Sequence, residues 1–350
     1  MTVENLLFFA KQHIHSDHAK ILLAELLNKN PLELLNYLNL EVDEKTVETY
    51  KAYVKALEEG KPLQYVMGYV NFYGNTFEIN ENVLIPRYET EELVEKTIGF
   101  VKKFFTTPVD IIDLGTGSGV IGLTLEKKLS TNSVDLVDIS KKALEVTHKN
   151  CVKLNSKAKL IESDMFKNVE KQYDVIISNP PYIKTNEEIE EIVKNNEPSL
   201  ALYAGKDGLD CYKKILKDIL PHTKERCLIA FEIGMTQGDA IKALAKEYLP
   251  NTKVEVYKEI ECYLFLKILN KILTKTSLLK WKRGFYMKKL LIILSIIVLA
   301  LTITKKEKVI VPTNSIRFRV IANSNTEHDQ EVKKTLIKNL YTEIRYINTY

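Results

Sequence analysis

Cysteine is scarce in this 350-residue chain, and its four cysteines are too far apart to form a CxxC motif. This spacing argues against a disulfide framework or a zinc knot, and it predicts reduced, mostly buried thiols in a cytoplasmic protein. Bulk positive charge is also missing from the main body. Residues 1–280 carry 37 Lys and Arg against 41 Asp and Glu, so the formal net charge of +4 comes from the tail. The body therefore lacks the basic surplus of a protein that follows phosphate backbones.

Extended apolar runs alternate with helical segments from residue 109 to about 269. We expect strands at 109–115, 133–139, 158–164, 173–179, 227–234, 253–259 and 262–269. The first four alternate with helices at the spacing of βαβ units, which predicts a parallel, doubly wound α/β sheet. Too little chain separates the last two for a crossover helix, so they should form an antiparallel hairpin at one edge.

The N-terminal segment differs in character from this sheet. Leucines and other apolar residues at helical spacing predict a small helical domain in residues 1 to about 60, with Asp17 as a possible cap and Pro31 at a break. Residues 60–79 alternate aromatic and β-branched side chains with Gly and Asn, which predicts a short linking hairpin. After Pro86, a helix should begin at Glu89 or Thr90.

Three histidines, His13, His15 and His18, lie close together in this helical segment. They come with no matching set of other ligands, and a solvated position near a helix start explains them better than metal binding. We therefore expect no metal site.

A glycine-rich turn joins the first strand of the sheet to its helix. The sequence "DLGTGSG" places Gly115, Thr116, Gly117, Ser118 and Gly119 where the backbone can turn tightly and approach a ligand at a helix N-terminus. A GxGxG loop alone is a weak signal, because dinucleotide enzymes use similar loops.

The ends of the next two strands add polar groups to this turn. Asp138 ends the second strand, where its carboxylate could accept two ribose hydroxyls, although an NAD enzyme would carry an acid there and a plain helix cap would look the same. Asp164 and Met165 end the third strand and could bind an adenine amino group and ring, while Met165 could equally be core packing. We expect these side chains to line one crevice.

The fourth strand ends on Asn179, Pro180, Pro181 and Tyr182, which continue neither a strand nor a helix well. A planar nitrogen, such as an amide or the exocyclic amine of a base, has two N–H donors to satisfy. The Asn179 side-chain oxygen and the Pro180 carbonyl can each accept one of them, and Tyr182 offers a flat face. This arrangement indicates positioning and electrostatic stabilisation of a poor nucleophile, with no strong base needed.

With these motifs in order, the chain resembles a Rossmann-like, class I methyltransferase that uses S-adenosylmethionine and carries the NPPY motif of amino-nitrogen methylation. More narrowly, residues from 1 to about 260 resemble the HemK/PrmC family, which methylates the side-chain amide of the glutamine in the GGQ motif of peptide chain release factors. The resemblance is carried by an ordered series of blocks: "PLQYVMGYVNFYG", "VLIPRYETEELVE", "DLGTGSGVIGL", "VDIS", "SDMF", "SNPPYI", "EPSLAL", "GKDGLD" and "FEIG".

The resemblance implies a role for each site residue. Residues 115–119, Asp138, Asp164, Met165 and Asn179 would contact S-adenosylmethionine, and residues 179–182 would hold the glutamine amide. Residues 1–75 would be a helical domain that docks the release factor, and 76–270 the methyltransferase domain. Arg87 would help to close the site, in a role that spacing does not assign. We expect a monomer in the cytoplasm.

The competing hypothesis is a nucleic-acid amino methyltransferase that acts on adenine N6 or guanine N2 of a flipped base through the same motif. It would need a basic recognition surface. Residues 1–80 carry 7 Lys against 11 Asp and Glu, a balance that suits a basic protein partner better than phosphates. We therefore expect no stable binding to nucleic acid.

The C-terminal tail does not fit this family. After a linker or translated intergenic segment at 271–286, residues 287–304 resemble a signal peptide or short anchor, with an apolar run shorter than the ~20 residues of a membrane span. Residues 305–350 resemble a truncated start of stage II sporulation protein R. We predict a read-through, frameshift or join of two neighbouring genes, with Met287 as the second start. Membrane contact is expected only if 287–304 is translated and inserted.

Overall fold

The computed structural model describes residues 1–250, 253–258 and 263–270. The predictions made for the tail, at 271–286, 287–304 and 305–350, lie outside these described residues. Within the described part of the chain, no helix is both long and apolar enough to cross a membrane.

The N-terminal helices bury a core of their own. They are α1 Val3–Ala10, α2 Ser16–Leu26, the 3-10 helix η1 Leu34–Tyr37, α3 Glu44–Glu58 and α4 Leu63–Met67. Leu6, Leu22 and Tyr50 are fully buried among them, because apolar residues at helical spacing share one face of each helix.

The predicted cap of α2 was wrong. His15 is the N-cap, and its Nδ1 accepts the backbone N–H of Asp17 at 3.4 Å. Asp17 lies in the first turn instead. Its negative charge there interacts favourably with the positive end of the helix dipole. His13 Nδ1 lies 2.8 Å from Glu58 Oε1. Over the described ranges, no group of three or more His, Cys, Asp or Glu side chains is placed to hold a metal ion.

A short antiparallel hairpin, β1 Tyr69–Phe72 and β2 Asn75–Glu78, follows α4 as expected. Its two-residue turn uses Tyr73 and Gly74, both at positive φ, which suits the twist of a tight hairpin. Helix α5, Tyr88–Phe104, begins one residue earlier than the predicted Glu89, with Arg87 as an N-cap that makes no side-chain bond.

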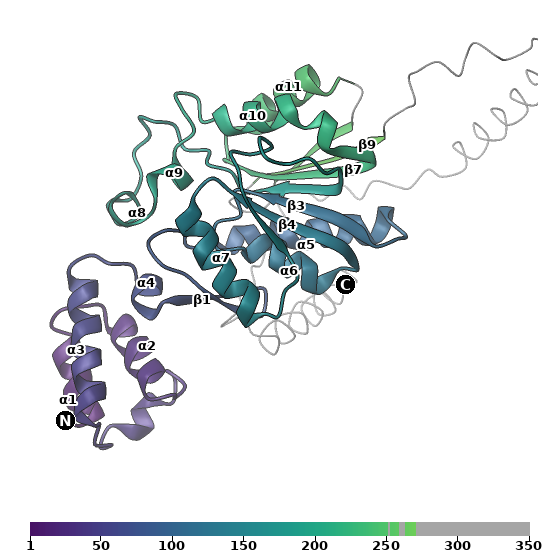
Figure 1. The fold of residues 1–350 in the computed structure, drawn as a ribbon. Helices are drawn as coiled ribbons and strands as arrows, with labels where there is room; N and C mark the ends of the chain where they lie inside the picture. Colours follow the sequence, from purple (N-terminus) through teal and green to yellow (C-terminus); the bar gives the residue numbers. More distant parts are fainter. Residues whose placement is uncertain (251–252, 259–262, 271–350) are drawn as a thin grey trace, which may run out of the picture. The chain divides into compact units, whose positions relative to one another are not determined.

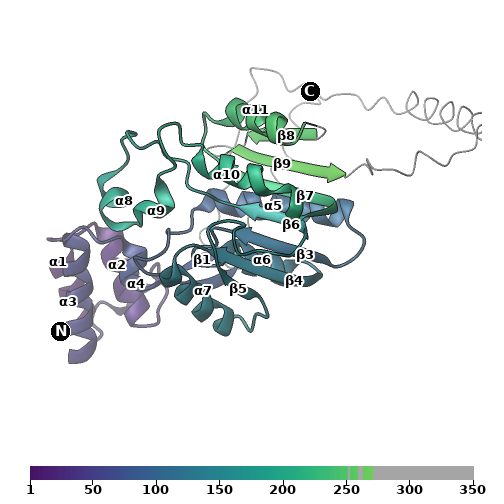
Figure 2. The same ribbon diagram turned by 45° about the horizontal axis from the view of Figure 1, so that its top comes forward.

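The main sheet has seven strands in the order β5-β4-β3-β6-β7-β9-β8. The strands are β3 Val109–Leu114, β4 Thr131–Asp138, β5 Lys159–Glu162, β6 Tyr173–Ser178, β7 Thr223–Ile233, β8 Lys253–Lys258 and β9 Tyr263–Asn270. Strands β3 to β7 pair in parallel, while β9 runs antiparallel to both β7 and β8. Figure 2 shows β8 and β9 beside β7 at one edge. The predicted α/β fold with an antiparallel edge hairpin is confirmed.

Helices cover both faces of this sheet (Figure 1). The remaining helices are α6 Val120–Lys128, α7 Lys141–Lys153, α8 Glu191–Asn196, α9 Ser199–Leu202, α10 Asp210–Asp218, the 3-10 helix η2 Leu220–His222 and α11 Gly238–Tyr248. Residues of α5, α6 and α7 pack on one face, and residues of α10 and α11 pack on the other. Every residue of β3 is buried, since a strand of a parallel sheet is covered on both sides.

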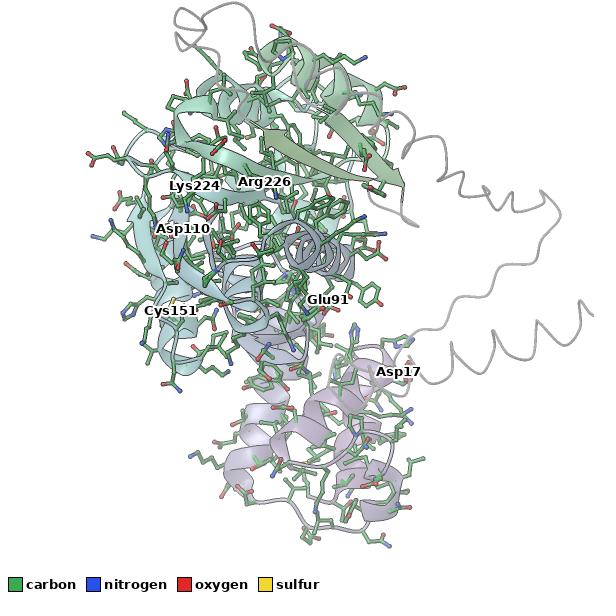
Figure 3. The ribbon with its side chains drawn as sticks, turned by 90° about the vertical axis from the view of Figure 1, so that its right-hand side faces the viewer. Asp17, Glu91, Asp110, Cys151, Lys224 and Arg226 are labelled. Atoms are coloured by element: carbon green, nitrogen blue, oxygen red, sulfur yellow. The ribbon has the colours of Figure 1, made fainter. Side chains whose placement is uncertain are left out.

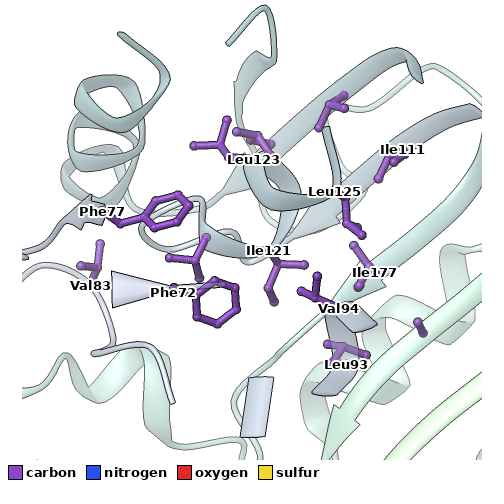
Figure 4. Packing of buried hydrophobic residues seen from close by; sticks show 14 of the residues in the cluster. Phe72, Phe77, Val83, Leu93, Val94, Ile111, Ile121, Leu123, Leu125 and Ile177 are labelled. Carbon is purple, nitrogen blue, oxygen red and sulfur yellow. The ribbon is translucent and has the colours of Figure 1, made fainter. Parts of the chain in front are cut away.

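The alternation of side chains along β3 assigns them to two cores. Ile111 packs with α5 to α7, while Ile112 and Leu114 pack with α10 and α11. In the first core the hairpin takes part: Phe72 and Phe77 lie edge to face with ring centroids 6.1 Å apart, near the side chains of α6 (Figure 4). The hairpin is therefore anchored by burial on the core of the main sheet.

An ion-pair cluster lies at the amino ends of the parallel strands. Asp110 pairs with Lys171 at 2.7 Å and with Lys224, and Lys224 also pairs with Asp174 at 2.6 Å; Figure 3 shows Asp110 and Lys224 close together. Burial alone would raise the pKa of Asp110, but hydrogen bonds from both lysines hold it below its usual value. These charges lie at the edge of the sheet opposite the strand ends that carry the predicted site.

One buried amide joins the hairpin to the glycine loop. Asn150, on α7, accepts the N–H of Glu78 at 2.7 Å and donates to the Glu78 carbonyl at 2.9 Å and to the Ser118 carbonyl at 2.8 Å. Its side chain is fully buried, the Ser118 carbonyl is buried and the two Glu78 groups are partly buried, so losing the amide would leave groups with little access to water unpaired.

We expect Asn150→Ala to lower the free energy of unfolding by about 3 kcal/mol, because it leaves one buried and two partly buried backbone groups without their partner. Thermal unfolding of the full chain would show a melting temperature lower by at least about 5 °C. The exposed neighbour Lys149→Ala is the control and should change stability by no more than about 0.5 kcal/mol. Equal melting temperatures for the two variants would contradict the role of Asn150.

Candidate functional site

The site lies where the strand order reverses. After β3 the chain adds β4 and β5 on one side of it and then β6 on the other. The loops that leave β3 and β6 therefore diverge, and ligands of open α/β sheets bind in the crevice at such a point. Ser178 Oγ, at the end of β6, donates to the Leu114 carbonyl at the end of β3 at 2.6 Å. This bond holds the two strand ends together.

The glycine loop is shaped for close approach by a ligand. Gly115 and Gly117 have φ of 69° and 57°, and a Cβ at either position would meet nothing within 4 Å. Gly119 has a different role: a Cβ there would lie 2.9 Å from side-chain atoms of Leu123 and Thr147. The first two glycines thus leave open space, while the third permits close packing of α6 and α7.

Asp113 supports this loop from below. Its Oδ2 accepts the Thr116 hydroxyl at 2.7 Å and the Gly122 N–H at 3.0 Å. Complete burial raises the pKa of Asp113 to about 6, against the opposing effect of these hydrogen bonds. The carboxyl fixes the loop from inside the protein and does not reach the ligand side.

Asp138 ties the ends of two strands together. Its Oδ2 accepts the N–H of Gly117 at 2.9 Å, and its Oδ1 accepts the N–H of Ser140 at 2.8 Å. Burial raises its pKa, and these backbone N–H groups act in the opposite direction. Each carboxylate oxygen keeps further acceptor capacity, so the group can still bind a vicinal diol. The alternative that Asp138 merely caps the next helix is excluded, because Ser140 is the N-cap of α7.

The turn after β5 carries strain. Met165 has a φ of 52°, a left-handed conformation that costs a non-glycine residue of order 1 kcal/mol. The Ser163 hydroxyl donates to the Met165 carbonyl at 2.9 Å and stabilises the turn. Asp164 pairs with Lys214 of α10. Met165 packs partly against the second core, so its two predicted roles are compatible.

These segments enclose one cavity of about 390 Å³, which is within the usual range for small-molecule sites. It brings together most of the predicted site residues, from four strand ends. They are Gly115, Thr116, Gly117, Ser118, Asp138, Asp164, Met165, Asn179 and Pro181. Gly119, Pro180 and Tyr182 are not among its lining residues; Gly119 is the N-cap of α6 just behind the loop.

The sequence reasoning missed several lining residues because they come from distant segments. They are Thr90 of α5, Pro198 and Leu200 near α9, and Asp210, Cys211 and Lys214 of α10. The blocks "EPSLAL" and "GKDGLD" lie at or next to the segments that carry Pro198, Leu200 and the α10 residues, so they could have pointed to them. Neither spacing nor periodicity shows that these segments face the glycine loop.

Gln237 was also missed, and it holds the loop after Asn179 in place. Its Nε2 donates to the carbonyls of Tyr182 and Gly208, both at 3.0 Å, and its Oε1 accepts the Gly234 N–H at 3.0 Å. A Cβ at Gly208 would lie 2.3 Å from the Tyr182 carbonyl oxygen. The glycines of "GKDGLD" and "FEIG" thus allow three loops to meet at one amide.

Arg87 does not line the cavity. Its guanidinium bonds to Glu197 Oε1 at 2.5 Å, and Glu197 Oε2 accepts the N–H of Ile85 at 3.0 Å. Glu197 is buried, so this charge-assisted pair joins the segment before α5 to the "EPSLAL" segment beside the cavity. The role of Arg87, which the sequence did not assign, is therefore to hold these two segments together through Glu197.

Comparison with known proteins agrees with this geometry. Residues 97–200 match the Methyltransferase small domain, and residues 8–68 match the PrmC N-terminal domain. The chain is 39% identical over 235 residues to the release factor glutamine methyltransferase of Bacillus subtilis (strain 168), which covers 65% of this chain and 82% of that protein. The chain belongs to the release factor glutamine methyltransferase family. It is an enzyme that uses S-adenosylmethionine.

A second curated relative matches this chain to a similar extent. The release factor glutamine methyltransferase of Streptococcus pneumoniae (strain ATCC BAA-255 / R6) is 39% identical over 222 residues, 62% of this chain and 78% of that protein. Among solved structures, the ribosomal protein L11 methylase of Lactobacillus delbrueckii subsp. bulgaricus has a TM-score of 0.41 at 17% identity, covering 55% of this chain and 84% of that chain. The predicted likeness of the tail to sporulation protein R stays a prediction.

We expect Asp138→Asn to weaken binding of S-adenosylmethionine about tenfold to a hundredfold. The new NH₂ group would face the N–H of either Gly117 or Ser140, and the charged acceptor for the ribose would be lost. Isothermal titration calorimetry on the full chain measures the effect. Asp218→Asn makes the same charge change on an exposed part of α10 and serves as the control. An affinity equal to that of this control would remove Asp138 from the cofactor site.

Proposed function

We propose that this enzyme transfers the methyl group of S-adenosylmethionine to the side-chain amide nitrogen of the glutamine in the GGQ motif of peptide chain release factors. The observation that carries this proposal is that Asn179 of the NPPY loop lines the same cavity as the glycine loop and Asp138. The names of the relatives, which pair this family with release factors, supply the substrate class.

The residues of the cavity suit the cofactor. The open backbone at Gly115 and Gly117 can accept the close approach of its amino-acid part, with Thr116 and Ser118 between them, and Asp138 can accept the ribose hydroxyls. Asp164 and Met165 would hold the adenine. When bound, the cofactor supplies an electrophilic methyl group on a sulfonium.

Asn179, Pro180 and Tyr182 would act on the acceptor amide. Its nitrogen lone pair is delocalised into the carbonyl, so the nitrogen is a weak nucleophile that gains from exact placement. In our proposal the Asn179 Oδ1 and the Pro180 carbonyl accept its two N–H groups, and Pro181 and Tyr182 complete the surface against which the amide lies. The new N–CH₃ bond would form at this nitrogen as the methyl–sulfur bond breaks, so that a neutral thioether, S-adenosylhomocysteine, would leave. The nitrogen would then give one of its protons to solvent water.

Residues 1–75 would dock the release factor, and residues 76–270 would carry out catalysis. The acidic balance of the N-terminal residues favours a basic protein surface. Phe8, Leu32 and Leu35 are large apolar side chains of this domain that are more than half exposed, and such residues supply contact area in protein interfaces.

The finer statements about the chain's state are also proposals. We propose a monomer that acts in the cytoplasm, where release factors meet ribosomes, with the tail after about 270 added by read-through or by a join of two genes. Sequencing of the locus and of its transcript tests the tail directly, since an uninterrupted frame and a native protein of about 40 kDa would contradict a join.

The substrate assay uses the full chain and S-adenosylmethionine with a labelled methyl group. Purified release factor, duplex DNA and ribosomal RNA are offered separately. We expect label on the release factor alone, mapped by mass spectrometry to the GGQ glutamine. A release factor with Ala in place of that glutamine is the matched control and should stay unlabelled. Label on nucleic acid instead would contradict the proposal and support the base-methylating alternative.

We expect Asn179→Ala to lower the rate of methyl transfer by about a hundredfold to a thousandfold, the cost of losing one preorganised polar contact in a reaction centre. Binding of S-adenosylmethionine, measured by calorimetry, should fall much less, because the glycine loop and Asp138 remain. A variant that keeps the wild-type rate would show that the acceptor is bound by other groups.

A further inference from the structure

A buried carboxylate lies behind Asn179, and nothing so far assigns it a role. Glu232 is in the "FEIG" block at the end of β7, with 1% of its surface exposed. Its Oε2 accepts the hydroxyl of Thr90 at 2.8 Å, and Thr90 Oγ1 in turn accepts the side-chain N–H of Asn179 at 3.2 Å. Three residues far apart in the chain thus form one hydrogen-bonded row that ends at the cavity.

The direction of each bond in this row is fixed by the charge at its inner end. An ionised carboxylate can only accept, so the Thr90 proton must point to Glu232. The Thr90 oxygen then faces Asn179 with a lone pair, and the Asn179 group beside it must be the NH₂. The opposite orientation of the amide would set two acceptors against each other at the cost of an unsatisfied buried group.

We propose that Glu232 and Thr90 are positioning residues that orient the Asn179 amide, so that its Oδ1 is the group presented to the acceptor nitrogen. An Asn179 turned the other way would present N–H donors to an amide that itself has N–H donors to satisfy. The hydrogen bonds of this row therefore determine whether Asn179 presents a hydrogen-bond acceptor or a donor to the acceptor amide. This inference rests on the proposed function.

The row also predicts a dependence on pH. Burial raises the pKa of Glu232 to about 7, in opposition to the hydrogen bond from Thr90 and to a smaller effect of the Asn179 side chain, whose NH₂ group also faces this carboxyl. Of the nearby charges, Glu89 acts in the same direction as burial and Arg87 against it. Below this pH the carboxyl is protonated and can donate to Thr90, which then turns its own proton toward Asn179 and favours the wrong amide orientation. The methyl-transfer step should therefore slow as the pH falls through about 7.

Helix α5 offers a matched control. Thr97 is on the same helix as Thr90 and is also fully buried, but its hydroxyl has no hydrogen-bond partner among the described residues. A Thr-to-Val change at either position removes a hydroxyl and keeps the volume. Only the change at Thr90 interrupts the row.

The test measures single-turnover methyl transfer by the full chain, with saturating labelled cofactor and release factor, which separates chemistry from binding and product release. We expect Thr90→Val to slow this step about tenfold to a hundredfold. Thr90→Ser, which restores the hydroxyl, should recover most of that loss. Thr97→Val should stay within about twofold of the wild type, and calorimetry should give similar cofactor affinities for all three.

The pH profile is the readout that a merely structural role would not move. The wild-type rate should show an acid limb near pH 7, and Glu232→Gln, which is neutral at every pH, should lack it. A wild-type rate that stays flat between about pH 5.5 and 8.5 overturns the inference without any variant. So does an acid limb that Glu232→Gln retains, or a Thr90→Val rate equal to that of Thr97→Val.

Failure of the inference and of the proposed function can be distinguished. If the wild type places no label on the release factor, the proposed substrate is wrong. If label goes to nucleic acid, the same variants are compared on that acceptor, because an exocyclic amine needs the same acceptor oxygen. If the wild type labels the release factor but Thr90 and Glu232 prove neutral, only the positioning role is overturned.

Discussion

The parallel pairing of β3 with β6 is the constraint on which the site depends. Ile111, Ile112 and Asp113 lie in register with residues 175–177, so the two strands end side by side. The Ser178 hydroxyl donates a hydrogen bond to the Leu114 carbonyl and links the two ends. Because the chain departs in opposite directions from these two ends, the crevice between them stays open. The glycine loop and the NPPY loop meet there without either having to bend toward the other.

Much of the remaining structure holds these two loops in place. Asp113 supports the glycine loop from the core, Asp138 binds it from the next strand, and Asn150 links it to the hairpin. On the other side, Gln237 binds the loop after Asn179. Asp113 accepts the Thr116 hydroxyl, and the other three side chains bond to backbone groups. Such directional bonds fix loop geometry more closely than apolar packing alone. The site is preorganised by polar contacts within a fold held together by two apolar cores.

The site also separates its charged groups by function. The lysine and aspartate pairs around Asp110 lie at the amino ends of the strands, where they can stabilise the sheet without influencing the acceptor. At the carboxyl ends the buried carboxyls, Asp113, Asp138 and Glu232, each accept hydrogen bonds and have raised pKa values. An amide acceptor needs oriented acceptors rather than a strong base, and this is what buried, hydrogen-bonded carboxyl groups provide.

The sequence by itself determined the strands, the parallel sheet with its edge hairpin, and the loops that carry the site, because strand periodicity, glycine turns and NPPY are local signals. Asn179, Asp138 and the glycines could be identified from it for the same reason. Only the tertiary structure decided what lies behind them. Gln237 is 55 positions from Tyr182, Thr90 is 89 positions from Asn179, and Glu232 is 142 positions from Thr90. No local pattern records such contacts, which exist only when β7 and α5 pack beside β6.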